Sequence, residues 1–113
     1  MAEISYSKST TGNGDLLVTW ASVTEADTFQ QFPLDEVVSE ISVHITGTFG
    51  GATVTVQGGN VASGMLDLIQ IGGAVASATA SDIFSLVDRP LYIQPAHSGG
   101  SGESVDIYML VRK

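Results

Sequence analysis

Two histidines, His44 and His97, are the side chains of this sequence best suited to general acid–base chemistry or to metal binding. Neither has another histidine three to five residues away, and the chain has no cysteine, so the usual zinc-ligand spacings are absent. His44 falls in the polar phase of an alternating segment, which predicts a solvent-facing position. His97 precedes the Gly/Ser-rich segment 98–103, which contains no Gly-x-Ser-x-Gly elbow for a serine nucleophile. We therefore interpret 98–103 as a flexible connection between strands.

Carboxylate pairs and glycines are the other candidates for chemistry. Glu25 with Asp27, and Asp35 with Glu36, could hold a hard cation, but the spacing of an EF-hand loop is missing, and solvated surface charge is the simpler interpretation. The glycines of segment 47–51 are not followed by Lys-Ser/Thr, and a strand pattern rather than a helix follows them, which indicates a turn instead of a phosphate loop.

The aromatic residues leave two alternatives, a sugar-stacking platform or the hydrophobic core. Aromatics make up only 7% of the chain, which favours the core. The residues concerned are Trp20, Phe29, Phe32 and Phe49. The sequence thus predicts a protein that is not an enzyme, with no catalytic residue, no cofactor and no metal site.

The charge balance excludes several partners. The 113 residues carry 12 acidic and 4 basic side chains, a formal charge of −8. Phosphate neutralisation by a nucleic-acid binder needs the opposite sign, and an anionic membrane surface would repel the chain. No apolar stretch approaches the roughly 18 residues of a membrane span. Segment 1–5 has an acidic residue where a signal peptide is basic, so we expect synthesis in the cytoplasm of the producing cell.

Apolar and polar residues alternate with period two in segments 40–49 and 53–57, which is the pattern of half-buried strands. The Gly-Gly pair between them predicts a β-hairpin, with Phe49 covering its turn. The residues expected to face one another across this hairpin are Val43, Ile45, Val54 and Val56.

The other strands are shorter, apart from a closing strand over 104–112 with its odd-numbered residues on one face. We expect strands at 16–20, 26–32, 66–71 and 91–94, the last a short or edge strand between two prolines. Segment 81–87 could form one helical turn capped by Ser81. The predicted fold is all-β, an antiparallel β-sandwich (Ig-like or jelly-roll-like) of about seven to eight short strands with at most one helical turn.

Residues 1–14 are predicted to form a flexible or docking N-terminal arm, and residues 15–113 a single β-sandwich domain. The arm is rich in Ser, Thr and Gly and offers little apolar area. Ile4 and Tyr6 would lie on one face of an extended chain and could add to a neighbouring subunit's sheet. Removal of residues 2–11 is expected to spare folding and to weaken assembly.

Two blocks of the sequence carry a resemblance to a known group of proteins. Residues 45–58 (ITGTFGGATVTVQG) and 89–95 (RPLYIQP), followed by a Gly/Ser loop and a hydrophobic strand ending in Arg-Lys, resemble small β-sandwich structural proteins of tailed-bacteriophage virions. The resemblance covers roughly residues 40–113, and segment 59–66 departs from the group's pattern.

The resemblance implies a non-enzymatic virion component, first of all a capsid decoration (cement) protein on the outer shell. The alternatives are a tail- or fibre-associated adaptor or receptor-contacting protein and, as a third class, a carbohydrate-binding module. The implied partner is the major capsid protein or another virion protein, with self-association or many copies per particle, on the capsid exterior rather than the tail. Candidate interaction residues are Ile4, Tyr6, Arg89, Arg112 and Lys113.

Overall fold

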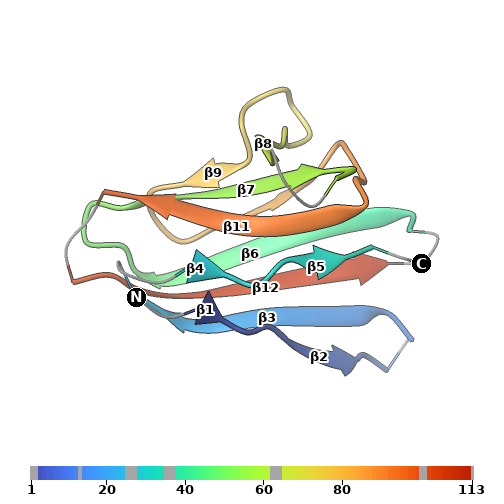
Figure 1. Cartoon of the computed structure of the whole chain (residues 1–113), viewed down its shortest axis with the longest axis horizontal. Helices are drawn as coiled ribbons and strands as arrows, with labels where there is room; N and C mark the ends of the chain where they lie inside the picture. Colours follow the sequence, from blue (N-terminus) through green and yellow to red (C-terminus); the bar gives the residue numbers. More distant parts are fainter. Residues whose placement is uncertain are drawn as a thin grey trace.

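The structure is a computed structural model that describes residues 3–12, 14–24, 28–34, 38–61, 65–99 and 102–112. Within these residues the chain forms two five-stranded sheets that pack together as a β-sandwich, and a two-stranded pair (Figure 1). All pairings within the two large sheets are antiparallel. The predicted antiparallel sandwich is confirmed.

The first sheet has the long strand β12 at its centre. Its strand order is β10 (Asp82–Ser85), β6 (Glu40–Thr48), β12 (Ser104–Arg112), β3 (Leu16–Val23) and β2 (Ser7–Thr10). The second sheet runs β5 (Phe32–Pro33), β11 (Tyr92–Ser98), β7 (Thr53–Gly59) and β8 (Leu66–Asp67), and β9 (Ser77–Ala78) also pairs with β7. The two-stranded pair is parallel and joins β1 (Glu3–Ile4) to β4 (Thr28–Phe29).

Alternation along the central strands builds the core between the sheets. The odd-numbered residues of β12 from Val105 to Val111 are all buried, as the sequence predicted, because successive strand side chains point to opposite faces. The aromatic residues Trp20, Phe29, Phe32 and Phe49 are also buried, so the sugar-platform alternative is wrong. The indole Nε1–H of Trp20 donates to the carbonyl of Gln30 at 3.0 Å, which satisfies the one polar group of that ring.

The predicted hairpin between β6 and β7 is wrong. β6 pairs with β10 and β12 in one sheet, whereas β7 pairs with β8, β9 and β11 in the other. The turn at Gly50 and Gly51, both with positive φ, therefore carries the chain from one sheet to the other. The four valines and isoleucines named for the hairpin are all buried, on strands of opposite sheets, and Phe49 is buried beside the turn. They build the sandwich core instead of a hairpin face.

Two smaller predictions also differ from the structure. The strands number ten in the two sheets, against seven to eight expected, because short strands such as β8 and β9 were not separable in the sequence. Segment 81–87 contains strand β10 rather than a helical turn, since it gains backbone partners along β6. β11 continues through Pro95 to Ser98, and Pro95 is tolerated because β5 pairs with β11 only at Tyr92 and Ile93.

Residues of the predicted N-terminal arm pair within the chain. β1 lies parallel to β4, and β2 forms the edge of the first sheet beside β3. The side chains of β2 are all exposed, and they include Lys8, a residue type common on sheet edges. Residues 1, 2 and 13 of the arm lie outside the described residues. Docking of the arm onto a neighbouring subunit stays a prediction.

Gly47 of β6 lies opposite Val105 of β12, and its replacement by alanine should cost about 3 kcal/mol of unfolding free energy. Its φ is 130°, and an added Cβ would meet the carbonyl oxygen of Ser104 and lie 2.9 Å from the Cα of Val105. Gly72→Ala is the matched control, because Gly72 has a φ of 112° but open space around it. The control should cost only about 1 kcal/mol in urea unfolding. Equal losses for both variants would contradict the close approach.

Candidate protein-interaction surface

The five residues predicted to contact a partner are mostly engaged within the chain. Ile4 and Tyr6 are half-buried and pack against the core. Arg89 is exposed, and its guanidinium donates two hydrogen bonds to the carbonyl of Ser39. Arg112 lies 3.7 Å from the carboxylate of Asp15. The fifth, at position 113, lies outside the described residues. Ser39 links the two arginines, because its carbonyl accepts from Arg89 and its backbone N–H donates to the carbonyl of Arg112 at 2.7 Å.

Tyr6 is the main anchor of the N-terminal strands. Its ring meets the rings of Trp20 and Phe32 edge-on, with centroids 6.1 and 5.2 Å apart. Its backbone N–H donates to Oε1 of Gln30 at 3.2 Å. Deletion of residues 2–11 is therefore expected to lower stability rather than to spare it.

Replacement of Tyr6 by alanine should lower the free energy of unfolding by about 2 kcal/mol, because two edge-to-face contacts and much of the buried ring are lost. Tyr6→Phe keeps the ring and should stay within about 0.5 kcal/mol of wild type. Chemical denaturation of both variants measures the difference. If the alanine variant is as stable as the phenylalanine variant, Tyr6 does not anchor residues 1–14 to the core, and the prediction of a flexible arm would stand.

The two histidines differ in their surroundings. His44 is exposed on β6, as predicted, and its ring lies 5.8 Å from that of Tyr108. His97, which precedes the connection predicted over 98–103, lies within β11 opposite Val54, and its side chain is only 7% exposed. Its ring packs against that of Phe29 in a T-shaped arrangement, with the ring centroids 5.6 Å apart. His97 is therefore an inward-facing residue at the end of the core.

Glu103, which the sequence analysis missed, is the partner of His97. Nδ1 of His97 and Oε1 of Glu103 lie 3.0 Å apart, and the Glu103 side chain is fully enclosed. Its second oxygen, Oε2, has no hydrogen-bond partner in the described part of the chain. A signal was available, because Glu103 stands two residues before Val105 and so continues the inward phase of β12. This pair spans the sandwich end between β11 and β12.

The enclosure of this pair argues for a structural role. A general base must reach a substrate proton within hydrogen-bond distance, directly or through one water. The carboxylate of Glu103 has no exposed surface through which a substrate could approach. The described residues contain no group of three potential metal ligands, and the carboxylates of 25–27 and 35–36 lie outside them.

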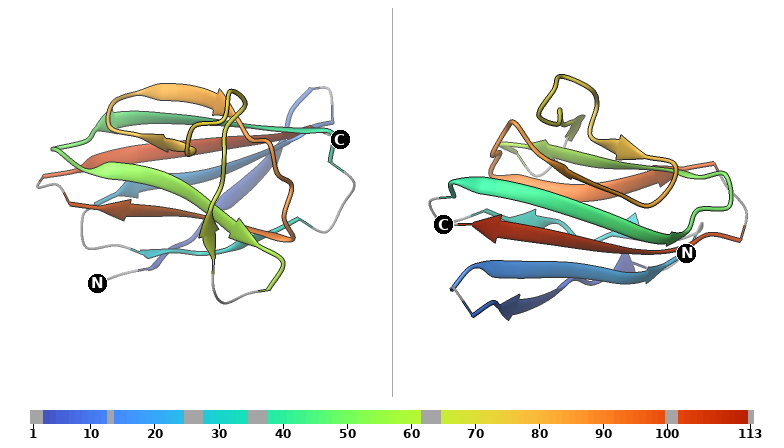
Figure 2. Two further views of the ribbon diagram at one scale, coloured as in Figure 1. Left: turned by 90° about the horizontal axis from the view of Figure 1, so that it is seen from above. Right: turned by 180° about the vertical axis from the view of Figure 1, so that it is seen from behind.

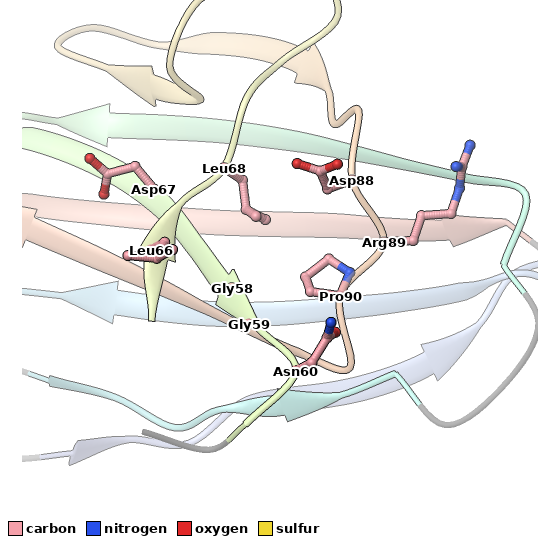
Figure 3. Close-up of a pocket in the computed structure, with 9 residues that line it drawn as sticks. All are labelled: Gly58, Gly59, Asn60, Leu66, Asp67, Leu68, Asp88, Arg89 and Pro90. Carbon is pink, nitrogen blue, oxygen red and sulfur yellow. The ribbon is translucent and has the colours of Figure 1, made fainter. Parts of the chain in front are cut away.

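A shallow depression of about 350 Å³ lies beside Arg89 (Figure 3). Its lining residues are Gly58, Gly59, Asn60, Leu66, Asp67, Leu68, Asp88, Arg89 and Pro90. In Figure 3 the carboxylates of Asp67 and Asp88 stand on either side of Leu68, and Arg89 extends away from both. The polar groups do not converge on one point, so the depression lacks the arrangement of a small-molecule site.

The most distinctive surface feature is a set of exposed apolar side chains that the sequence analysis did not predict. Every large exposed hydrophobic side chain among the described residues lies between positions 61 and 91. They are Val61, Leu66, Ile69, Ile71, Val75, Ile83, Val87 and Leu91. Seen from above, segment 65–80 lies between β7 and β10, along one long side of the sandwich (Figure 2).

Five of these exposed side chains lie on segments that are paired or hydrogen-bonded to one another, and we call them the apolar strip: Ile69, Ile71, Val75, Ile83 and Val87. Ile69 is bridged to Val75 on one side, and its carbonyl accepts a hydrogen bond from the N–H of Val87 on the other. These three residues are therefore neighbours across three chain segments. The N–H of Ile71 donates to the carbonyl of Ser85, the last residue of β10, which places Ile71 beside β10. Ile83 lies on the same strand, two residues before Ser85.

Comparisons with known proteins add no relative: no protein-family model, curated protein or solved structure matches the chain. No helix in the described ranges is long and apolar enough to cross a membrane. The inference about function accordingly depends on the surface.

Proposed function

We propose that this protein is a non-enzymatic structural component of a tailed-bacteriophage virion, a decoration protein that binds the outer surface of the capsid shell. The observation that supports it best is the apolar strip, which presents five β-branched side chains to the outside of a rigid sandwich. Exposed apolar patches of this kind mark sites of contact with other proteins. The resemblance of residues 45–58 and 89–95 to small virion proteins gives this contact its setting.

Charge and multiplicity fit the same role. A net charge of −8 keeps free copies apart and favours the exterior of a shell over the vicinity of packaged DNA. A repeating shell offers many equivalent sites, so each copy needs only a modest interface. The major capsid protein is the proposed partner, and the virion the proposed location.

A tail- or fibre-associated adaptor is the second candidate, because an exposed apolar strip would serve a tail protein equally well. Copy number separates the two: a decoration protein is present in hundreds of copies, a tail component in far fewer. A carbohydrate-binding module is disfavoured, since the four aromatic side chains considered for a sugar platform are buried.

The test uses heads of a tailed phage that encodes this chain, assembled without the protein. Purified protein added in excess should saturate at a fixed number per capsomer and should raise the resistance of the heads to heat or osmotic shock. Quantitative mass spectrometry gives the stoichiometry and cryo-microscopy the location. Localisation only at the tail would favour the adaptor, and no binding to heads in excess protein would overturn the proposal.

A further inference from the structure

We infer that the apolar strip is a docking site for a foreign protein surface with an apolar centre and a rim of Lys or Arg side chains, and not for a second copy of this chain. This inference deepens the proposed function, on which it rests in taking that partner to be the capsid shell. Three features of the strip support it: the side chains point outward, backbone hydrogen bonds hold them in place, and carboxylates flank them.

The strip residues alternate with residues that close the core. Leu68, Ala76 and Leu86 are buried, whereas their neighbours Ile69 and Val87 point outward and are 41% and 47% exposed. The core is therefore already covered by the inward members of these segments. The outward isoleucines and valines do not help to cover the core, so packing within the chain does not explain why these positions are apolar.

Backbone hydrogen bonds fix the strip in place. Leu68 donates to Val56 and Val56 to Ala76, which ties the segment to β7. On the other side Ile71 donates to Ser85 at 2.8 Å and Val87 to Ile69 at 2.9 Å, which ties it to β10. The segment thus bridges the two sheets, and a partner would meet a preformed surface with little ordering cost.

The charged side chains that flank the strip in the sequence are acidic, apart from Arg89. The sequence from Leu68 to Ser81 contains no charged residue, and the flanking carboxylates of Asp67, Asp82 and Asp88 are exposed. The nearby Arg89 is engaged by the backbone carbonyl of Ser39. An apolar centre with an acidic rim complements an apolar surface bordered by cations.

The same rim disfavours a second copy. In a two-fold symmetric dimer each copy presents the same patch, so acidic rims would oppose one another. Each chain also carries a formal charge of −8, which adds long-range repulsion. A foreign surface with a basic rim is attracted both by the acidic residues that flank the strip and by the net negative charge of the chain.

The chemistry of the strip can be tested on the free protein with an amphiphile. Dodecyltrimethylammonium below its critical micelle concentration combines an apolar tail with a cation, and dodecyl sulfate is the matched anion. In ¹⁵N–¹H spectra the cation should shift the amides of residues 69–71, 75 and 83–87 at concentrations where the anion does not. Shifts concentrated elsewhere, or equal shifts with both amphiphiles, would overturn the inferred partner chemistry. In sedimentation velocity the protein should be a monomer, and a dimer abolished by strip variants would also overturn it.

The closing experiment combines strip variants with undecorated heads. The triple variant Ile71→Thr, Val75→Thr, Val87→Thr removes apolar contact while keeping β-branched side chains, and should weaken head binding about tenfold or more. The control Val61→Thr, Leu66→Thr, Leu91→Thr makes equivalent exchanges at exposed positions outside the strip, and should bind like wild type. Thermal unfolding verifies that both variants fold.

The outcomes separate the two proposals. If wild type binds heads and the strip variant binds equally well, the docking site is wrong and the decoration function stands. If wild type binds no heads, the decoration function is wrong, and the amphiphile and sedimentation measurements still decide the chemistry of the strip. If the strip and control variants lose binding equally, the assignment to the strip is wrong.

Discussion

Replacing Val43 with aspartate should lower the free energy of unfolding by more than about 4 kcal/mol, enough to unfold a large share of a marginally stable domain. Val43 is 1% exposed and lies in register between Phe84 of β10 and Met109 of β12. Both neighbours are buried and apolar, so the new carboxylate would find neither a hydrogen-bond partner nor water. It must be protonated or drag water into the core, and both cost stability.

Ser42→Asp is the matched control for this prediction. Ser42 is the preceding residue of β6, points to the opposite face and is half-buried. The same charge there should cost less than about 1 kcal/mol. Urea denaturation followed by tryptophan fluorescence suits both variants, because Trp20 is fully buried in the native protein. Similar midpoints for the two variants would show that the inward face of β6 is assigned wrongly.

The sequence predicted the faces of the long strands well, because alternation is a local property. In β6 and β12 every position expected to point inward is buried from Ile41 to Ile45 and from Val105 to Val111. Strand partners depend on residues far apart in the chain. A Gly-Gly turn reverses the chain direction equally well within one sheet or between two, so the local signal could not decide between a hairpin and a crossover. The insertion of β12 between β3 and β6 decides it in the structure.

The surface was harder to predict than the core, for a similar reason. Ile69 and Ile71 fall in the strand predicted over 66–71, and Ile83 in the helical turn predicted over 81–87, and large apolar residues of such elements are expected to be buried. In the structure the inward positions of segment 65–80 are filled by Leu68 and by two small side chains, Ala76 and Ala78. Alternation shows which residues share a face but not which face is inward when both are apolar.

The buried pair of His97 and Glu103 leads to the second large prediction. Replacing His97 with phenylalanine should lower the free energy of unfolding by about 3–5 kcal/mol, because the enclosed Glu103 carboxylate loses the partner of its Oε1 atom. Its Oε2 atom already has no hydrogen-bond partner among the residues described, so no second contact compensates. Glu103→Leu should cost less, because the group it removes is the carboxylate, which is the more costly of the two to leave buried without a hydrogen-bond partner.

The double variant His97→Phe, Glu103→Leu makes this prediction decisive. It replaces both polar groups by apolar ones, and such replacements of buried ion pairs are often neutral or stabilising. We therefore expect the double variant to be more stable than His97→Phe alone, by about 2 kcal/mol or more. Thermal and urea unfolding of the four proteins complete the cycle. Additive losses in the cycle would mean that the two side chains do not interact in solution, and that Glu103 reaches water at the end of the sandwich. A recovered double variant would show that the two side chains act as a pair and that apolar packing can replace them at this end of the sandwich.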